Sequence, residues 1–309
     1  MLRVDAEDLC DLQGLGELMG HHPGSIGSND VAVGGNLRVA CSEMFPKRPY
    51  RDSMLARSAT LALLALLAAP TSAEAPRRTV AIAAAANLKT AAEELKSGFE
   101  LEHPGVDVAL SFGASGAFFA QIQNGAPFDL FLSADREFPA KVVAAKLGSA
   151  ADERVYAFGK LVAWLPPGST LDLASRGLKA LTDPGVRSIA LANPAVAPFG
   201  RATEAALKSA GVYEAVKQKL VMGTSVGQAA QFATTGAADV AFLPYSLTFE
   251  RELSAGRVVF VAETLYPKIE QSGIVLSGAK EPGLARAFLE FMTREKGRAI
   301  LAKYGYGLP

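Results

Sequence analysis

Histidine and cysteine are scarce in this sequence, which has 3 His and 2 Cys in 309 residues. Both cysteines and two of the histidines precede residue 76, so residues 76–309 contain no cysteine and only His103. This part of the chain therefore has no disulfide and no thiolate. It is also poorly supplied for a zinc site or for a catalytic pair of Ser or Cys with His.

Charge of one sign is not in excess either, because 31 Lys and Arg balance 31 Asp and Glu. Basic residues are not interleaved with aromatic ones, so the sequence does not predict nucleic-acid binding. A chain of this length and composition is typical of a globular protein with two domains.

The longest apolar run, Leu61–Ala69, is too short for a transmembrane helix. Arg57 precedes the run, and a small-x-small site that ends at Ala75 follows it. Residues 54–75 therefore predict a secretory signal peptide and a periplasmic location, with a membrane anchor as the weaker alternative. Residues 1–53 show no sustained period, and we interpret them as a disordered leader or as the product of an upstream start, with Met54 as the true start.

Strand and helix signals alternate through residues 76–309, which predicts an α/β fold with largely parallel sheets. The stretch "YAFGKLVAWLPPG" is long for one strand and could pass from one lobe to another, with a second passage within 245–265. We therefore expect two lobes around a cleft, formed by 76–158 plus 262–309 and by 159–261.

Four predicted strand-to-helix junctions share one chemistry of small residues, glycine, and a hydroxyl or amide. They are Ala86-Asn87-Leu88, Gly113-Ala114-Ser115-Gly116, Ala197-Pro198-Phe199-Gly200 and Thr224-Ser225-Val226-Gly227. A helix start has unpaired N–H groups and about half a positive charge, so it binds anions without a cationic side chain. Taken singly, Asn87 or Ser115 could be an ordinary N-cap. Taken together, the four junctions predict an anion site.

Two other patterns have simpler interpretations. The residues "GTSVG" around Ser225 satisfy the nucleophile elbow of α/β-hydrolases. No histidine follows Ser225 in the chain, so a serine hydrolase remains only a remote alternative. The carboxylates Asp129 and Asp135 flank an apolar strand, and we expect them to cap turns. Arg201 is expected on a helix surface rather than at a ligand.

The segments "AAAANLKTA", "SFGASGAFFAQIQNGAPFDLFLSAD", "NPAVAPFGRATEAAL", "GTSVGQAAQFATTGAADVAFLPYS" and "FLEFMTREKGRAILAKYGYGLP" occur in this order. Together they resemble the periplasmic molybdate/tungstate-binding proteins of ABC importers, the ModA family, over essentially all of 76–309. The resemblance implies a two-lobed type II solute-binding fold (Venus flytrap), in which each lobe is a mainly parallel sheet flanked by helices. It also implies a monomer that is not an enzyme, has no cofactor, and delivers its ligand to a permease in the inner membrane.

The same resemblance implies a set of ligand-binding residues. Asn87 stands where the family often has Ser, and Ser115 matches a second hydroxyl ligand. Phe199 and Val226 stand where the family donates backbone N–H groups. Some members of the family bind the ligand through a further Tyr hydroxyl, at a position near "FLPYS". In this sequence Pro244 aligns with that tyrosine and Tyr245 is the next residue. Tyr245 is therefore either the hydroxyl donor or a half-buried residue of the cleft wall.

A site built from donors suits molybdate or tungstate, whose oxygens carry no proton at neutral pH and only accept hydrogen bonds. Hydrogen phosphate would lack an acceptor for its proton, and an unpaired buried polar group costs about 1–3 kcal/mol. Sulfate also lacks a proton, so only size can exclude it. Another tetrahedral oxyanion such as sulfate therefore remains an alternative ligand, and a ferric-ion-binding protein of the same fold is another.

Overall fold

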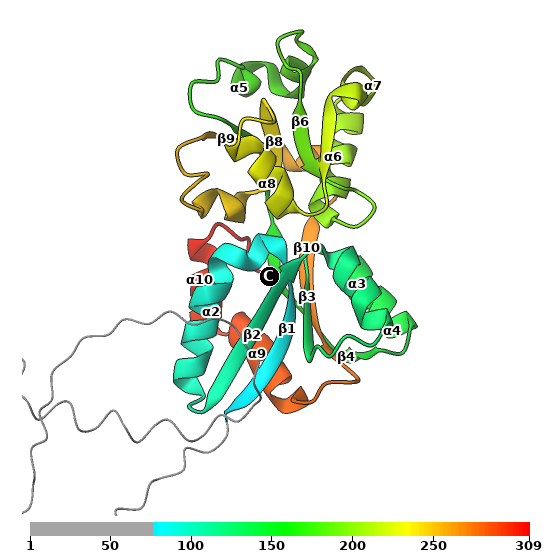
Figure 1. Cartoon of the computed structure of the whole chain (residues 1–309), viewed down its shortest axis with the longest axis vertical. Helices are drawn as coiled ribbons and strands as arrows, with labels where there is room; N and C mark the ends of the chain where they lie inside the picture. Colours follow the sequence, from blue (N-terminus) through cyan, green and yellow to red (C-terminus); the bar gives the residue numbers. More distant parts are fainter. Residues whose placement is uncertain (1–76) are drawn as a thin grey trace, which may run out of the picture. The chain divides into compact units, whose positions relative to one another are not determined.

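The computed structural model describes residues 77–309, which form two five-stranded sheets with helices packed on them (Figure 1). The expected leader (1–53) and signal peptide (54–75) lie outside the described residues. Among those residues, no helix is long and apolar enough to cross a membrane.

The first sheet has the strand order β2-β1-β3-β10-β4. Its strands are β1 (Arg78–Ala85), β2 (Val106–Gly113), β3 (Leu130–Ser133), β4 (Gly148–Gly159) and β10 (Ile269–Leu276). Strand β1 is parallel to β2 and β3, whereas β10 is antiparallel to β3 and β4. Helices α2 (Lys89–Glu102), α3 (Ser115–Gln123), α4 (Glu137–Ala144), α9 (Pro282–Thr293) and α10 (Glu295–Lys303) pack on this sheet.

The second sheet has the order β7-β6-β8-β5-β9. Its strands are β5 (Leu161–Leu165), β6 (Ile189–Ala192), β7 (Leu220–Gly223), β8 (Val240–Pro244) and β9 (Arg257–Phe260). The helices around it are α5 (Leu173–Arg176), α6 (Pro198–Ser209), α7 (Tyr213–Val216) and α8 (Val226–Thr234). Short 3-10 turns are η2 (Ala86–Leu88), η3 (Gly177–Thr182), η4 (Lys217–Lys219), η5 (Tyr245–Phe249) and η6 (Glu263–Leu265).

Each sheet is half parallel and half antiparallel, which is less parallel than the sequence suggests. The antiparallel strands are those next to the two passages between the sheets. One passage is Lys160, between β4 and β5, and the other is 261–268, between β9 and β10. Neither passage contains the crossover helix that a parallel connection needs. We propose that these two passages mark the lobe boundaries expected from the sequence.

The central strands β1, β3 and β10 of the first sheet are buried on both faces. One face packs against α2, α9 and α10, and the other against α3 and α4 (Figure 1). Strand β1 shows why, because Val80 and Ile82 belong to the first core and Ala83 to the second. Fully burying a side chain such as Ile82 contributes about 1.5–3 kcal/mol.

The segment "GLARAFLEFMTREKGRAILAKYG" predicts a single long C-terminal helix, but the structure breaks it at Arg294 into α9 and α10. Gly297 allows the close contact between the two pieces, because a Cβ there would lie 2.2 Å from the carbonyl oxygen of Phe291. The hydrophobic pattern continues through the break, which is why periodicity alone does not reveal it.

Candidate functional site

The four junctions predicted from the sequence meet between the two sheets. They lie at the carboxyl ends of β1, β2, β6 and β7, where ligands bind in open α/β sheets. Eleven residues line a small cavity here: Ala85, Ala86, Asn87, Gly113, Ala114, Ser115, Ala134, Ala197, Pro198, Phe199 and Val226. The volume open to the centre of a water molecule is about 10 Å³. A drug-sized ligand needs a pocket of about 300 Å³ or more, so only a small ion or molecule fits.

Ser115 begins α3 and is 1% exposed. It is not the N-cap, because Ala114 occupies that position and no side chain caps the helix. The Ser115 hydroxyl oxygen instead accepts a hydrogen bond from the N–H of Ala134 at 3.0 Å. Since this bond occupies a lone pair, the hydroxyl hydrogen remains available to a ligand that accepts hydrogen bonds.

Asn87 lies in the middle of η2 and is 1% exposed. Its carbonyl oxygen accepts bonds from the hydroxyls of Tyr306 (2.7 Å) and Ser246 (2.9 Å). Its side-chain Nδ2 donates to Oε1 of Gln271 (2.8 Å) and to the Tyr306 hydroxyl (3.1 Å). Its Oδ1 is buried and has no partner. Asn87 is therefore not an N-cap but the centre of a buried polar network.

Two tyrosine hydroxyls complete this network. Tyr156 donates toward the carbonyl oxygen of Ser133 (2.9 Å) and toward Oε1 of Gln271 (3.1 Å). Burial raises the pKa of both Tyr156 and Tyr306 well above that of a free tyrosine, so both hydroxyls keep their protons.

The second sheet contributes the starts of α6 and α8. Pro198 is the first residue of α6 and has no N–H, so Phe199 supplies the first free amide. Gly200 allows α6 to approach β6, because a Cβ there would lie 2.1 Å from the carbonyl oxygen of Ala192. Val226 is the first residue of α8, and its N–H has no acceptor within the helix.

Of the four helix starts, only that of α8 has a side-chain cap. Ser225 accepts a bond from the N–H of Gln228 at 3.3 Å. The N-cap positions at η2, α3 and α6 are the alanines 85, 114 and 197, which have no polar side chain. No side chain therefore occupies the first-turn N–H groups of these three junctions, and of those in α3 the Gly116 N–H donates to the carbonyl oxygen of Val196.

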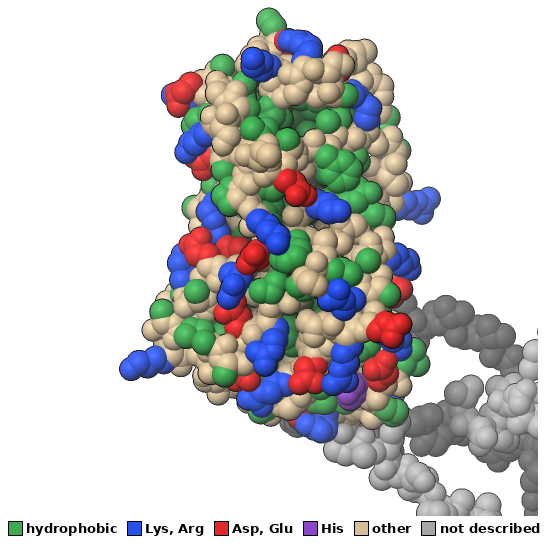
Figure 2. All heavy atoms as spheres, turned by 180° about the vertical axis from the view of Figure 1, so that it is seen from behind, with side chains coloured by type: hydrophobic (Ala, Val, Ile, Leu, Met, Phe, Trp, Pro, Cys, Tyr) green, Lys and Arg blue, Asp and Glu red, His purple; other side chains and the backbone are tan. Residues whose placement is uncertain are grey.

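No charged side chain lines the cavity, but an ion pair lies beside it. Arg201 of α6 pairs with Asp135, which follows β3, and with Glu137 at 3.3 Å, so the pair joins the two sheets. Asp135 also accepts the N–H of Phe138 at 3.2 Å, which is its expected capping role. Burial raises the pKa of Asp135 and outweighs the opposing effects of Phe138 and Arg201. Elsewhere the two signs of charge are interspersed on the face seen in Figure 2.

A family model described as bacterial extracellular solute-binding protein matches residues 80–307. This chain belongs to that family. The solute-binding protein is 37% identical over 257 residues to the molybdate-binding protein ModA of Rhodobacter capsulatus, covering 83% of this chain and 98% of the relative. A solved structure, the periplasmic molybdate-binding protein of Azotobacter vinelandii, aligns with a TM-score of 0.69 and 33% identity, over 74% of this chain and 99% of that one.

The fold itself is shared more widely. The sulfate-binding protein SubI from Mycobacterium tuberculosis aligns with a TM-score of 0.63 but only 19% identity, over 74% of this chain and 86% of that one. The expected two-sheet α/β fold of a periplasmic binding protein is confirmed by these matches. At such low identity the sulfate protein supports the fold alone.

Four of the five predicted ligand-binding residues, Asn87, Ser115, Phe199 and Val226, line the cavity of this solute-binding protein. Tyr245 does not. Its ring packs on Phe249 (5.2 Å between ring centres) and on Phe260 (4.7 Å). Tyr245 is therefore half-buried against these two rings and does not line the cavity.

The residues that hold Asn87 are not apparent from the sequence. Gln271 lies in the middle of β10, Ser246 in η5, and Tyr306 in the tail, where an aromatic residue indicates only packing. No spacing links them to Asn87. Gln271 stands between Glu270 and Ser272 in β10, so its polar character alone does not single it out.

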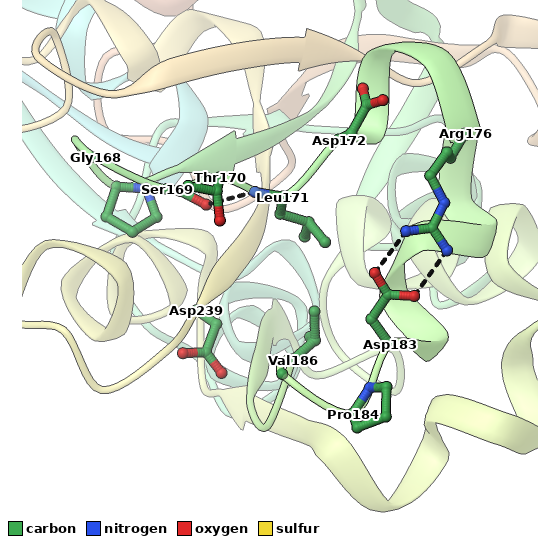
Figure 3. Close-up of a pocket in the computed structure, with 12 residues that line it drawn as sticks. Gly168, Ser169, Thr170, Leu171, Asp172, Arg176, Asp183, Pro184, Val186 and Asp239 are labelled. Carbon is green, nitrogen blue, oxygen red and sulfur yellow. Dashed lines mark hydrogen bonds and ion pairs between the residues drawn. The ribbon is translucent and has the colours of Figure 1, made fainter.

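A larger hollow in the second sheet's lobe lies away from this cavity. It measures about 640 Å³ and is formed by the loops 166–172 and 183–186, with Arg176 and Asp239 (Figure 3). Its charged groups are already paired. Arg176 binds Asp183 at 2.6 and 2.7 Å, and Asp239 accepts the N–H groups of Arg187 and Ser188. None of these charged groups is therefore free to orient a ligand.

The hydrolase alternative has no support in the geometry. Ser225 acts as a helix cap, and His103 stacks on Phe99, with 4.0 Å between the ring centres. Within residues 77–309, no three His, Cys, Asp or Glu side chains are grouped so that they could hold a metal ion.

Proposed function

We propose that this solute-binding protein binds one molybdate or tungstate ion in the cavity between the two sheets and delivers it to an ABC importer. The observation that carries the proposal is the lining of the cavity. Four helix starts and the hydroxyl of Ser115 converge on a space for one small ion, and no charged side chain is present. The molybdate-binding relatives support the choice of ligand.

The donors select the ionic form of the ligand. Ser115 is set to donate, because its oxygen already accepts from Ala134. Backbone N–H groups at Phe199 and Val226 can only donate. A proton-free dianion satisfies all of these groups, whereas hydrogen phosphate brings a proton for which no carboxylate is present.

Neutral donors are also compatible with release. Three further contacts join the lobes: the Gly116 N–H donates to the carbonyl oxygen of Val196 (2.9 Å), the Thr90 hydroxyl to that of Ser246 (3.1 Å), and Lys89 pairs with Glu250 (3.3 Å). Opening at Lys160 and 261–268 would break these contacts and expose the ion. We propose that a monomer then passes the ion to the permease in the inner membrane.

Sulfate and ferric iron are the competing ligands. Sulfate has the same charge and no proton, so it competes through size, because its smaller tetrahedron leaves some donors too far away. Ferric iron requires hard oxygen or nitrogen ligands, and residues 77–309 offer no suitable group of side chains.

A thermal-shift titration tests the function. The purified full chain, stripped of bound anions by partial unfolding and dialysis, is titrated with molybdate, tungstate, sulfate, phosphate and ferric citrate. A ligand at 100 times its dissociation constant adds about 2.7 kcal/mol of stability. We expect molybdate and tungstate to raise the melting temperature and sulfate and phosphate not to. Equal stabilisation by sulfate would contradict the proposed choice of ligand. An unchanged melting temperature with every oxyanion would contradict the proposed binding site.

The periplasmic location rests on the proposed signal peptide at 54–75. Expression of the full gene followed by N-terminal sequencing of the exported protein tests it. Cleavage after Ala75 gives Pro76 as the first residue. Retention of residues 1–53 in the exported protein would contradict both the signal peptide and the start at Met54.

A further inference from the structure

Two amide side chains that bond to each other each leave one atom unpaired. Nδ2 of Asn87 donates to Oε1 of Gln271, while Oδ1 of Asn87 and Nε2 of Gln271 have no partner. Gln271 is fully buried and Asn87 is 1% exposed. Leaving a buried amide group without a partner is costly, and each of these two side chains has one such atom.

Rotating both amides by half a turn gives a second arrangement of the same pair. Nε2 of Gln271 then donates to Oδ1 of Asn87, across the 2.8 Å contact, and to the Tyr156 hydroxyl, across the 3.1 Å contact. The Tyr156 hydroxyl accepts this bond and donates its own hydrogen bond to the carbonyl oxygen of Ser133, at 2.9 Å. In the first arrangement, by contrast, the single proton of Tyr156 faces two acceptors.

The two arrangements present different atoms to the cavity. Asn87 lines the cavity, and its Nδ2 bonds Gln271 and Tyr306 on one branch of the planar amide, so we infer that the other branch faces the cavity. The branch on the cavity side ends in Oδ1, an acceptor, in the first arrangement and in Nδ2, a donor, in the second. In the second arrangement the Tyr306 hydroxyl no longer accepts a hydrogen bond from Nδ2 of Asn87. A hydrogen bond from Nδ2 to a bound oxyanion offsets this loss.

We propose that Gln271 is the residue that determines the specificity of the site by positioning Asn87. When a proton-free oxyanion binds, the Asn87–Gln271 pair reverses, and Gln271 holds the Asn87 amide with its N–H₂ toward the ion. Without Gln271, the reversed orientation of Asn87 is no longer held, so the site loses its preference for a proton-free oxyanion. This proposal rests on the proposed oxyanion function and names a discriminating residue for that site.

The test combines two substitutions. Gln271→Met keeps the length of the side chain but removes both hydrogen-bonding ends. Asn87→Ser replaces the amide by a hydroxyl that is too short to reach Gln271 and can rotate by itself. Gln121→Met, the same exchange at an exposed position of α3, is the matched control. Calorimetry measures the dissociation constants of all variants for molybdate and for hydrogen phosphate at pH 7.

We expect Gln271→Met to weaken the binding of molybdate about tenfold and the binding of phosphate much less. The ratio of the two dissociation constants should therefore change about tenfold. In the Asn87→Ser background the same exchange should leave the ratio unchanged within twofold. If the role of Gln271 is purely structural, Gln271→Met will weaken the binding of both ligands in both backgrounds. That result would overturn the proposal. An unchanged ratio for Gln271→Met in the wild-type background would overturn it as well.

A measurement on the wild-type protein keeps the proposal testable if Gln271→Met does not fold. The side-chain N–H₂ resonances of Asn87 and Gln271 are assigned through their own side-chain carbons, and molybdate is then added. Both pairs of resonances should shift strongly. Binding of molybdate without a shift at Gln271 would refute the reversal but leave the proposed function intact, whereas no binding of any oxyanion would refute the function itself.

Discussion

The backbone N–H of Gly116 donates to the carbonyl oxygen of Val196 at 2.9 Å, and this bond joins the second residue of α3 to the loop before α6. The two residues belong to lobes on opposite sides of the cavity. The contact is possible because residue 116 has no side chain. A Cβ there would lie 2.9 Å from Cα and 3.0 Å from the carbonyl oxygen of Val196, closer than real Cβ atoms approach backbone.

Gly116→Ala should therefore oppose closure of the lobes while leaving each lobe folded. The added Cβ also meets the Phe138 ring at 2.8 Å, but the end of that ring can move. We expect at least a tenfold loss of molybdate affinity, measured by calorimetry, and a larger radius of gyration in solution scattering with molybdate present. Gly283→Ala in α9, where nothing lies within 4 Å, is the control. Wild-type affinity in Gly116→Ala would mean that this contact does not contribute to closure.

Ser115→Ala should weaken molybdate binding about 10- to 100-fold. The substitution removes one donor to the ion and leaves the N–H of Ala134 without its acceptor, and each such loss costs about 1–3 kcal/mol. Equilibrium titration with molybdate measures the effect. Ser97→Ala, which removes an exposed hydroxyl bonded to the carbonyl oxygen of Glu93, should leave the affinity unchanged. An unaltered affinity in Ser115→Ala would remove Ser115 from the site.

The fold and the backbone part of the site could be predicted from the sequence because both depend on local patterns. Alternating apolar runs predict the βα units, and small residues at the junctions predict free helix starts, as at Ala197-Pro198-Phe199. The arrangement around Asn87 could not be predicted in this way. Gln271 and Tyr306 reach it from strands and turns about 180 and 220 residues away, so only the three-dimensional fold brings them together.

The N-cap interpretation of single junctions was wrong at Asn87 and Ser115 for a related reason. Both residue types favour N-caps, but here each lies one position or more inside its turn and bonds to a distant group instead. Local propensity is outweighed by contacts across the sheet edge, namely the bond from Ala134 to Ser115 and the bond from Asn87 to Gln271.

Asp135 should make the stability of the protein depend on pH in the acid range. Burial raises its folded pKa above the value of 3.8 expected for a free side chain. The folded state therefore holds this proton more tightly than the unfolded state. The contribution of Asp135 is fully present below the unfolded pKa and is lost as the pH rises through the raised folded pKa.

Urea unfolding of the wild type and of Asp135→Asn, from pH 3.5 to pH 7, measures this effect. The free energy of unfolding of the wild type minus that of the variant should fall as the pH rises above about 3.8 and then become constant. Asp107→Asn, at an exposed carboxylate for which Lys96 is a partner, is the comparison. A difference that instead rises with pH would mean that the attraction of Arg201 outweighs burial and lowers the pKa of Asp135.

Tyr245→Phe should leave oxyanion binding unchanged within twofold. The resemblance makes Tyr245 a candidate donor, but its ring lies against Phe249 and Phe260, and it is not part of the cavity wall. Its backbone N–H, which donates to the carbonyl oxygen of Lys160 at 2.8 Å, is not altered by the substitution. Titration with molybdate, beside Tyr213→Phe on the distant α7 as control, measures the effect. A fivefold or greater loss in Tyr245→Phe alone would show that this hydroxyl reaches the ion when it is bound.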